Sequence, residues 1–112
     1  MVSISYTQEF RKQAKRLAKK YRSLADDLQA FVDELSQNPN MGKDLGSGVR
    51  KIRMAVKSKG KGKSGGMRVI TFNVIVDQTD SEITLLTVYD KSEKESISDK
   101  EIKMLLESIE QR

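Results

Sequence analysis

The sequence contains no cysteine, no histidine and no tryptophan, and only one proline. Without cysteine there can be no disulfide bond, thiolate nucleophile or zinc–thiolate site. Without histidine the chain lacks the side chain that most often acts as a general base near neutral pH. Any acid–base chemistry must therefore come from lysine, arginine, tyrosine, carboxylate or hydroxyl groups.

Long apolar runs are also absent. No segment approaches the roughly 20 apolar residues that a membrane-spanning helix requires, so we expect no membrane partner. The first ten residues, MVSISYTQEF, lack the charged-then-apolar pattern of a secretory signal, so we expect a cytoplasmic protein. A length of 112 residues suits one domain, residues 1–112.

Positive charge is present in excess and is unevenly distributed. The 21 basic and 16 acidic residues give a net charge of +5. Residues 45–76 hold eight of the basic residues and no acidic one, which leaves 13 basic against 16 acidic residues elsewhere. A loop that only aids solubility seldom needs charge of one sign, so the cluster favours a polyanionic partner. The seven cations of residues 11–22 fit a solvated helix face and an RNA contact equally well.

The N-terminal third has helical periodicity. From Phe10 to Leu35, apolar residues recur at alternating steps of four and three, which is typical of an amphipathic helix. One long coiled-coil helix would also fit. However, Ser23 followed by Asp26 resembles an N-cap with an acid in the first turn. We therefore predict two helices, about 7–20 and 24–37, that form a hairpin covering a sheet.

The rest of the chain alternates like a sheet and ends in a helix. Residues 2–6 suit a short edge strand, 67–76 a central strand and 83–90 a last strand. At the C-terminus, Ser98 with Glu101 fits a capping box, and Ile97 with Ile102 fits a hydrophobic staple. This order predicts an α+β fold: a helical hairpin on a small, meandering antiparallel sheet, with a C-terminal helix.

A further strand is predicted over residues 49–57, after a loop DLGSGV. Alternation places Ile52, Met54 and Val56 on one face and Lys51, Arg53 and Lys57 on the other, so one face is core and the other is a basic ladder. The next segment, KSKGKGKSGG, is too rich in glycine to be regular, and we expect it to be flexible.

These residues resemble a known family. VRKIRMAVKSKGKGKSGGMRVI (49–70), followed by ITLLTVYDKSE (83–93) and a short helix, is similar to the RelE/HigB superfamily of bacterial type II toxins. The glycine–lysine insertion is most similar to the HigB branch. The resemblance implies a RelE-like fold and a ribosome-dependent endoribonuclease that cuts mRNA in the ribosomal A site. It also implies a cognate antitoxin, often one with a helix-turn-helix domain.

The resemblance also implies site residues. Cleavage of RNA through its 2′-hydroxyl requires a base, charge stabilisation at phosphorus and an acid for the leaving oxygen. Lys51 and Arg53 match basic residues on the equivalent family strand, Arg68 matches the arginine that opens the next strand, and Lys91 matches the lysine that closes the last strand. We expect Arg68 to face a wet cleft and to grip the scissile phosphate. The alternative is an ion pair with a carboxylate such as Asp90.

The chain departs from the family at two positions. Ser92 stands where many relatives have arginine, and Ser98 stands where several have a catalytic tyrosine. Tyr89 could supply the phenol, either by stacking on a base or by donating a proton; alternatively it is a rim tyrosine with a solvent-facing hydroxyl, and the mechanism is based on lysine throughout. Together, the expected catalytic residues are Arg68, Lys91, Tyr89, Lys51 and Arg53.

The loop lysines suit electrostatic binding better than catalysis, because a flexible loop cannot hold a reacting group precisely. We expect RNA binding by Lys57, Lys59, Lys61 and Lys63. The segment KGKGKSGG lacks the Walker spacing and leads into a strand, which excludes a nucleotide-binding loop. No metal or other cofactor is expected, because the turn carboxylates lack cage-like spacing (Asp77, Asp80, Glu82 and Asp90).

Two other functions compete with the ribonuclease. A non-catalytic RNA- or ribosome-binding protein would need the same basic ladder, and only the grouping of Arg68, Tyr89 and Lys91 favours an enzyme. A ParE-type toxin that acts on DNA gyrase shares the fold, but that branch generally lacks the basic residues carried on strands. Lys51, Arg53 and Arg68 therefore count against it.

Overall fold

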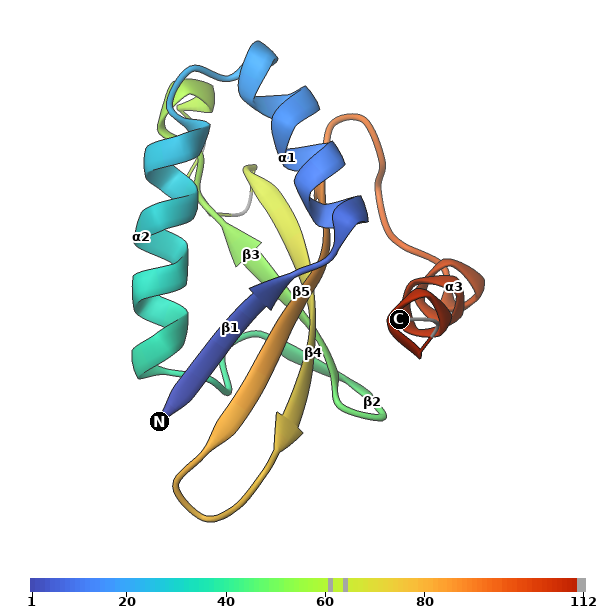
Figure 1. Cartoon of the computed structure of the whole chain (residues 1–112). Helices are drawn as coiled ribbons and strands as arrows, with labels where there is room; N and C mark the ends of the chain where they lie inside the picture. The colour runs from blue at the N-terminus through green and yellow to red at the C-terminus, as the bar shows by residue number, and fades with distance from the viewer. Residues whose placement is uncertain (61, 64, 111–112) are drawn as a thin grey trace.

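The structure is a computed structural model that describes residues 1–60, 62–63 and 65–110. Figure 1 shows an α+β fold, as the sequence predicts. In the described residues the elements follow the order β1 (Val2–Tyr6), α1 (Gln8–Lys20), α2 (Leu24–Gln37), β2 (Lys43–Gly46), β3 (Val49–Met54), the short 3₁₀ helix η1 (Lys57–Lys59), β4 (Met67–Ile75), β5 (Ser81–Asp90) and α3 (Asp99–Glu110).

The strands form one sheet in the order β1-β5-β4-β3-β2. β2 to β5 pair antiparallel, but β1 pairs parallel with β5, so the sheet is mixed rather than wholly antiparallel. The predicted loop before β3 is partly a strand, because β2 and β3 form a hairpin. Gly46, Ser47 and Gly48 all have positive φ there, which allows the tight turn.

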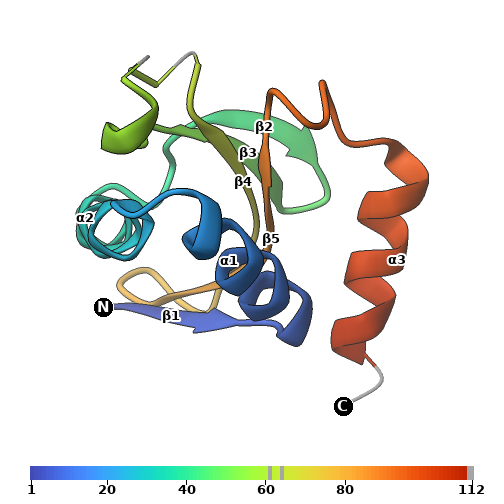
Figure 2. The ribbon, with the colours of Figure 1, turned by 90° about the horizontal axis from the view of Figure 1, so that it is seen from above.

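The helices cover both faces of the sheet. Figure 2 shows α1 and α2 on one side and α3 on the other. The larger core lies under α1 and α2, where Leu17 and Phe31 pack with Ile52 and Val69. The smaller core lies under α3 and contains Val49, Ile70, Leu86 and Tyr89.

Local hydrogen bonds explain where the helices begin. The Thr7 hydroxyl accepts from Phe10 N and caps α1. Ser98 and Glu101 form the predicted capping box of α3: Ser98 Oγ accepts from Glu101 N at 3.1 Å. α2 begins after Ser23 as predicted, but the Ser23 hydroxyl donates to Asp27 Oδ2 at 2.6 Å rather than capping the backbone.

The predicted strand over 49–57 is too long. β3 ends at Met54, and Lys57–Lys59 forms η1, with Gly60 in the left-handed conformation at its C-terminal end. The Asp27 carboxylate and Ser23 hydroxyl accept from the backbone N–H groups of Lys57 and Ser58, which fixes η1 on α2. This part of the expected flexible segment is therefore ordered by distant residues.

Candidate functional site

Three of the predicted site residues form one row across the sheet. In the strand register Arg53 of β3 lies opposite Arg68 of β4, and Arg68 lies opposite Tyr89 of β5. Lys51 belongs to the adjacent row, opposite Ile70. We call Arg53, Arg68 and Tyr89, together with Lys51 from the adjacent row, the cationic row.

The cationic row lies on the α3 face of the sheet. Ile70 and Tyr89 pack in the core under α3, whereas Ile52 and Met54 pack under α1 and α2. Because side chains alternate along a strand, Lys51 and Arg53 point to the same side as Ile70 and Tyr89. Arg53 is exposed and Lys51 is half-buried, so both can meet a ligand directly.

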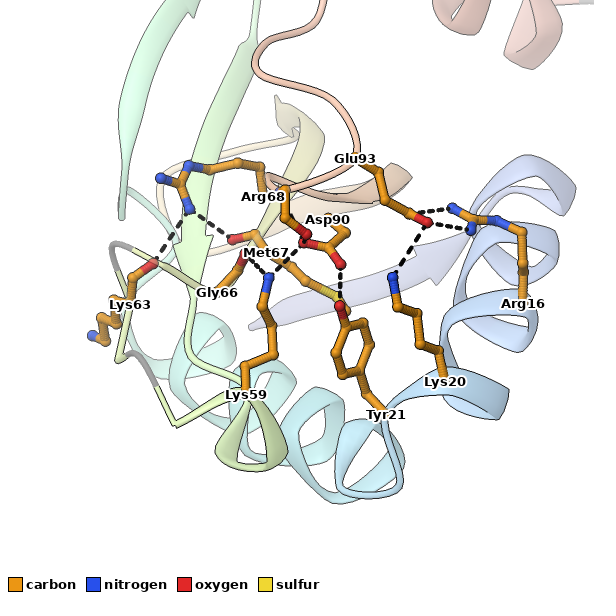
Figure 3. Close-up of polar contacts among 11 residues, drawn as sticks. Arg16, Lys20, Tyr21, Lys59, Lys63, Gly66, Met67, Arg68, Asp90 and Glu93 are labelled. Carbon is orange, nitrogen blue, oxygen red and sulfur yellow. Dashed lines mark hydrogen bonds and ion pairs between the residues drawn. The ribbon is translucent and has the colours of Figure 1, made fainter.

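Arg68 is more enclosed than the sequence suggests. We expected it in a wet cleft, but only 4% of its surface is exposed. Its Nη1 donates to the carbonyl oxygens of Lys63 (3.3 Å) and Met67 (3.2 Å), as Figure 3 shows. Burial lowers the pKa of Arg68, the neighbouring charge of Arg53 lowers it further, and Tyr89 opposes both effects.

Tyr89 is also buried, so it is not a rim tyrosine with a solvent-facing hydroxyl. It is 6% exposed, and its hydroxyl has no hydrogen-bond partner among the described residues. The Lys94 ammonium lies 5.7 Å from the ring centroid. Burial raises the pKa of Tyr89, although the nearby Arg68 opposes the rise. The phenol therefore remains protonated at neutral pH, which is the form that a proton donor requires.

Asp90 does not face the cationic row. It points to the α1/α2 side and is fully buried, where Lys59 Nζ lies 2.5 Å from Oδ1 and Tyr21 donates to Oδ2 (Figure 3). Both the N–H and the hydroxyl of Ser92 also donate to Asp90. Burial would raise the pKa of Asp90, but these donors outweigh it and hold the pKa well below its usual range.

This network changes the interpretation of Lys59. We predicted a flexible, RNA-binding lysine, yet the Lys59 side chain is 7% exposed and is committed to a buried ion pair. Lys59 Nζ also lies 5.4 Å from the centroid of the Tyr21 ring. Asp90 and Tyr21 are both far from Lys59 in sequence, so the composition of the loop could not reveal these contacts. The one local signal is the pair Asp90 and Ser92, which has the spacing of an Asx turn.

Lys91 lies in the turn directly after β5 and is exposed. Strand pairing ends at Asp90, so the register does not fix the position of Lys91 relative to the cationic row. The turn itself is held on both sides. Asp90 precedes Lys91, and Glu93 follows it and pairs with Arg16 (3.1 Å) and Lys20 (3.7 Å) of α1.

The remaining loop lysines have separate positions. Lys57 is exposed at the start of η1. Lys63 is exposed and pairs with Glu34 of α2 at 3.7 Å. Lys61 lies outside the described residues.

Comparison with known families identifies the class of this protein. Residues 6–111 match the family described as the RelE toxin of the RelE/RelB toxin–antitoxin system. The chain therefore belongs to the RelE toxin family. It is a toxin of a toxin–antitoxin system, which makes a cognate antitoxin its expected partner. None of the helices within the described residues is long and apolar enough to cross a membrane.

Proposed function

We propose that this toxin is an endoribonuclease of the HigB-like branch that cuts mRNA in the ribosomal A site and so stops translation. The observation that carries the proposal is the alignment of Arg53, Arg68 and Tyr89 across three adjacent strands. Two guanidinium groups beside a protonated phenol match the needs of phosphodiester cleavage: charge stabilisation at phosphorus and a proton for the leaving oxygen.

In this reaction a base removes the proton of the 2′-hydroxyl, and the 2′-oxygen attacks the adjacent phosphorus. The bond from phosphorus to the 5′-oxygen breaks, a 2′,3′-cyclic phosphate forms, and an acid donates a proton to the 5′-oxygen. Lys51, two residues before Arg53 on the same face of β3, is the proposed base. The proposed acid is the exposed Lys91, or Tyr89 once the residues that cover its hydroxyl shift. No step in this scheme uses a metal ion.

The residues differ in how they would reach RNA. Arg53 is exposed and would contact the phosphate first. Arg68 lies beside it in the row but is covered, so a direct contact with phosphate requires the segment around Lys63 to shift. The cytoplasm supplies both the ribosome and the mRNA, and an antitoxin with a helix-turn-helix domain would neutralise the toxin there.

The direct test is to induce the protein briefly in cells and to map the 5′ ends of transcripts. We expect new 5′ ends inside translated codons, and protein synthesis should stop before DNA replication does. Stalled replication with intact transcripts would instead support a ParE-type gyrase toxin. Ribosome binding without cut transcripts would support a non-catalytic binding protein.

A further inference from the structure

The outer edge of β3 is paired with another strand over only part of its length. β2 pairs with β3 as far as Lys43 opposite Lys51 and no further. Beyond this point β3 borders α2, and two adjoining clefts of about 420 and 150 Å³ lie between them. Both clefts are lined by Glu34, Arg53 and Lys63, so they form one continuous depression, which we call the α2–β3 groove.

The walls of the groove are built by identifiable contacts. Arg50 donates to the carbonyl oxygens of Asn40, Met41 and Gly42 at 2.8–2.9 Å, which holds the segment after α2 against the sheet. Gly42 has φ +83°, and a Cβ there would lie 2.5 Å from Lys51 O. Only glycine allows this close approach without a shift of the backbone.

The charge of the groove is mostly positive. Five basic residues line it, Lys43, Lys51, Arg53, Lys57 and Lys63; Lys51 and Arg53 do so from the edge of β3, although the register directs their side chains to the α3 face. Of the two carboxylates, Asp27 is 6% exposed and already accepts from Ser23 and from the backbone of Lys57. Glu34 is half-exposed but pairs with Lys63. A ligand that enters the groove therefore meets an excess of lysine and arginine.

We propose that the α2–β3 groove binds the sugar–phosphate backbone of single-stranded RNA and so extends the substrate path away from the cationic row. Arg53 belongs to both surfaces, so an RNA strand bound at Arg53 would also meet Lys43 and Lys63, which line the same cleft. This inference rests on the proposed function. It adds Lys43, which the sequence does not single out, as an RNA-binding residue.

The test measures RNA binding without cleavage. A labelled, unstructured RNA with 2′-O-methyl groups cannot be cut, so its fluorescence anisotropy reports binding whether or not the protein is a nuclease. The groove variant is Lys43→Gln/Lys63→Gln. The matched control is Lys100→Gln/Lys103→Gln, which removes the same charge from exposed positions on α3. All four residues are exposed, and exposed ion pairs contribute little stability, so both variants should fold.

For a single strand, the slope of log K against log salt flattens by about 0.7 for each phosphate that no longer meets a cation. We expect the groove variant to bind on the order of tenfold more weakly at 0.15 M salt, with a slope shallower by about 1.4, while the control stays close to wild type. Equal losses of affinity in the two variants would mean that RNA responds to the net charge of the protein and not to the groove, which would overturn the proposal. Unchanged RNA binding would also overturn it, even if the variant bound an acidic protein partner less well.

Discussion

Replacement of Lys59 by methionine should destabilise the folded protein much more than the position of Lys59 in a glycine–lysine loop suggests. The ammonium group is the only cation bonded to the fully buried Asp90 carboxylate in the part of the chain that the structure describes. Removing one member of a buried ion pair typically costs about 3–5 kcal/mol, because the remaining charge stays buried without its counter-charge. With a typical unfolding entropy for a chain of this length, the melting temperature should fall by roughly 13–21 °C.

The control is Lys57→Met in the same short helix. Lys57 is exposed, so its loss should change the free energy of unfolding by less than about 0.5 kcal/mol. The free energy of unfolding of both variants and of Lys59→Met/Asp90→Asn can be measured with denaturant. The double variant should recover part of the stability that Lys59→Met loses, because it no longer buries an unpaired carboxylate. If Lys59→Met were as stable as Lys57→Met but bound ribosomes more weakly, Lys59 would be an RNA contact and our reasoning would fail.

The same ion pair gives a pH dependence with a definite sign. The pKa of Asp90 is depressed in the folded state, so its contribution to stability is complete above the unfolded pKa near 4 and is lost as pH falls towards the folded pKa. Lys59→Met removes one of the donors that depress this pKa. The difference in stability between wild type and Lys59→Met should therefore be large at pH 7 and smaller at pH 3.

Three other experiments test the Tyr89 hydroxyl, the N-cap of α3 and the toxicity of the protein. Tyr89→Phe removes a buried hydroxyl without a described partner, so it should leave stability unchanged or raise it by up to about 1 kcal/mol; a clear loss in thermal melting would reveal a hidden partner. Ser98→Ala should cost about 1 kcal/mol, because it removes the N-cap of α3; a negligible loss in denaturant unfolding would mean that this cap is not formed. Co-expression of the neighbouring antitoxin gene should restore growth to cells that make this protein, whereas free growth without the antitoxin would contradict toxicity.

The helices could be predicted well because their signals are local. The alternating spacing from Phe10 to Leu35 and the capping box at Ser98 are both local patterns, and the structure confirms the two hairpin helices close to their predicted bounds and a C-terminal helix that begins after Ser98. The parallel pairing of β1 with β5 could not be predicted in this way. It joins residues about 80 positions apart, and nothing in VSISY fixes the direction of its partner.

In the candidate site, too, the features set by local sequence could be predicted and those set by distant contacts could not. Alternation correctly placed Lys51 and Arg53 together on one face, and the structure brings Arg68 and Tyr89 to them through the register. The burial of Arg68 and Tyr89 was missed because it depends on α3 and on the loop before β4. Lys59 was misjudged for a related reason: its chemistry is set by Asp90 and Tyr21, not by its neighbours in sequence. The catalytic roles of these residues, including Lys91, stay predictions.

The most direct test of the account is single-turnover cleavage of mRNA on programmed ribosomes at saturating toxin, measured together with thermal stability. Arg53→Ala and Arg68→Ala should each lower the cleavage rate on the order of 100- to 1000-fold while the protein stays folded at the assay temperature. Arg68→Lys should rescue little, because an ammonium group lacks the planar fork of a guanidinium, and Lys100→Ala should cleave like wild type. Wild-type rates from a folded Arg53→Ala and a folded Arg68→Ala would contradict the assignment of the cationic row as the catalytic site.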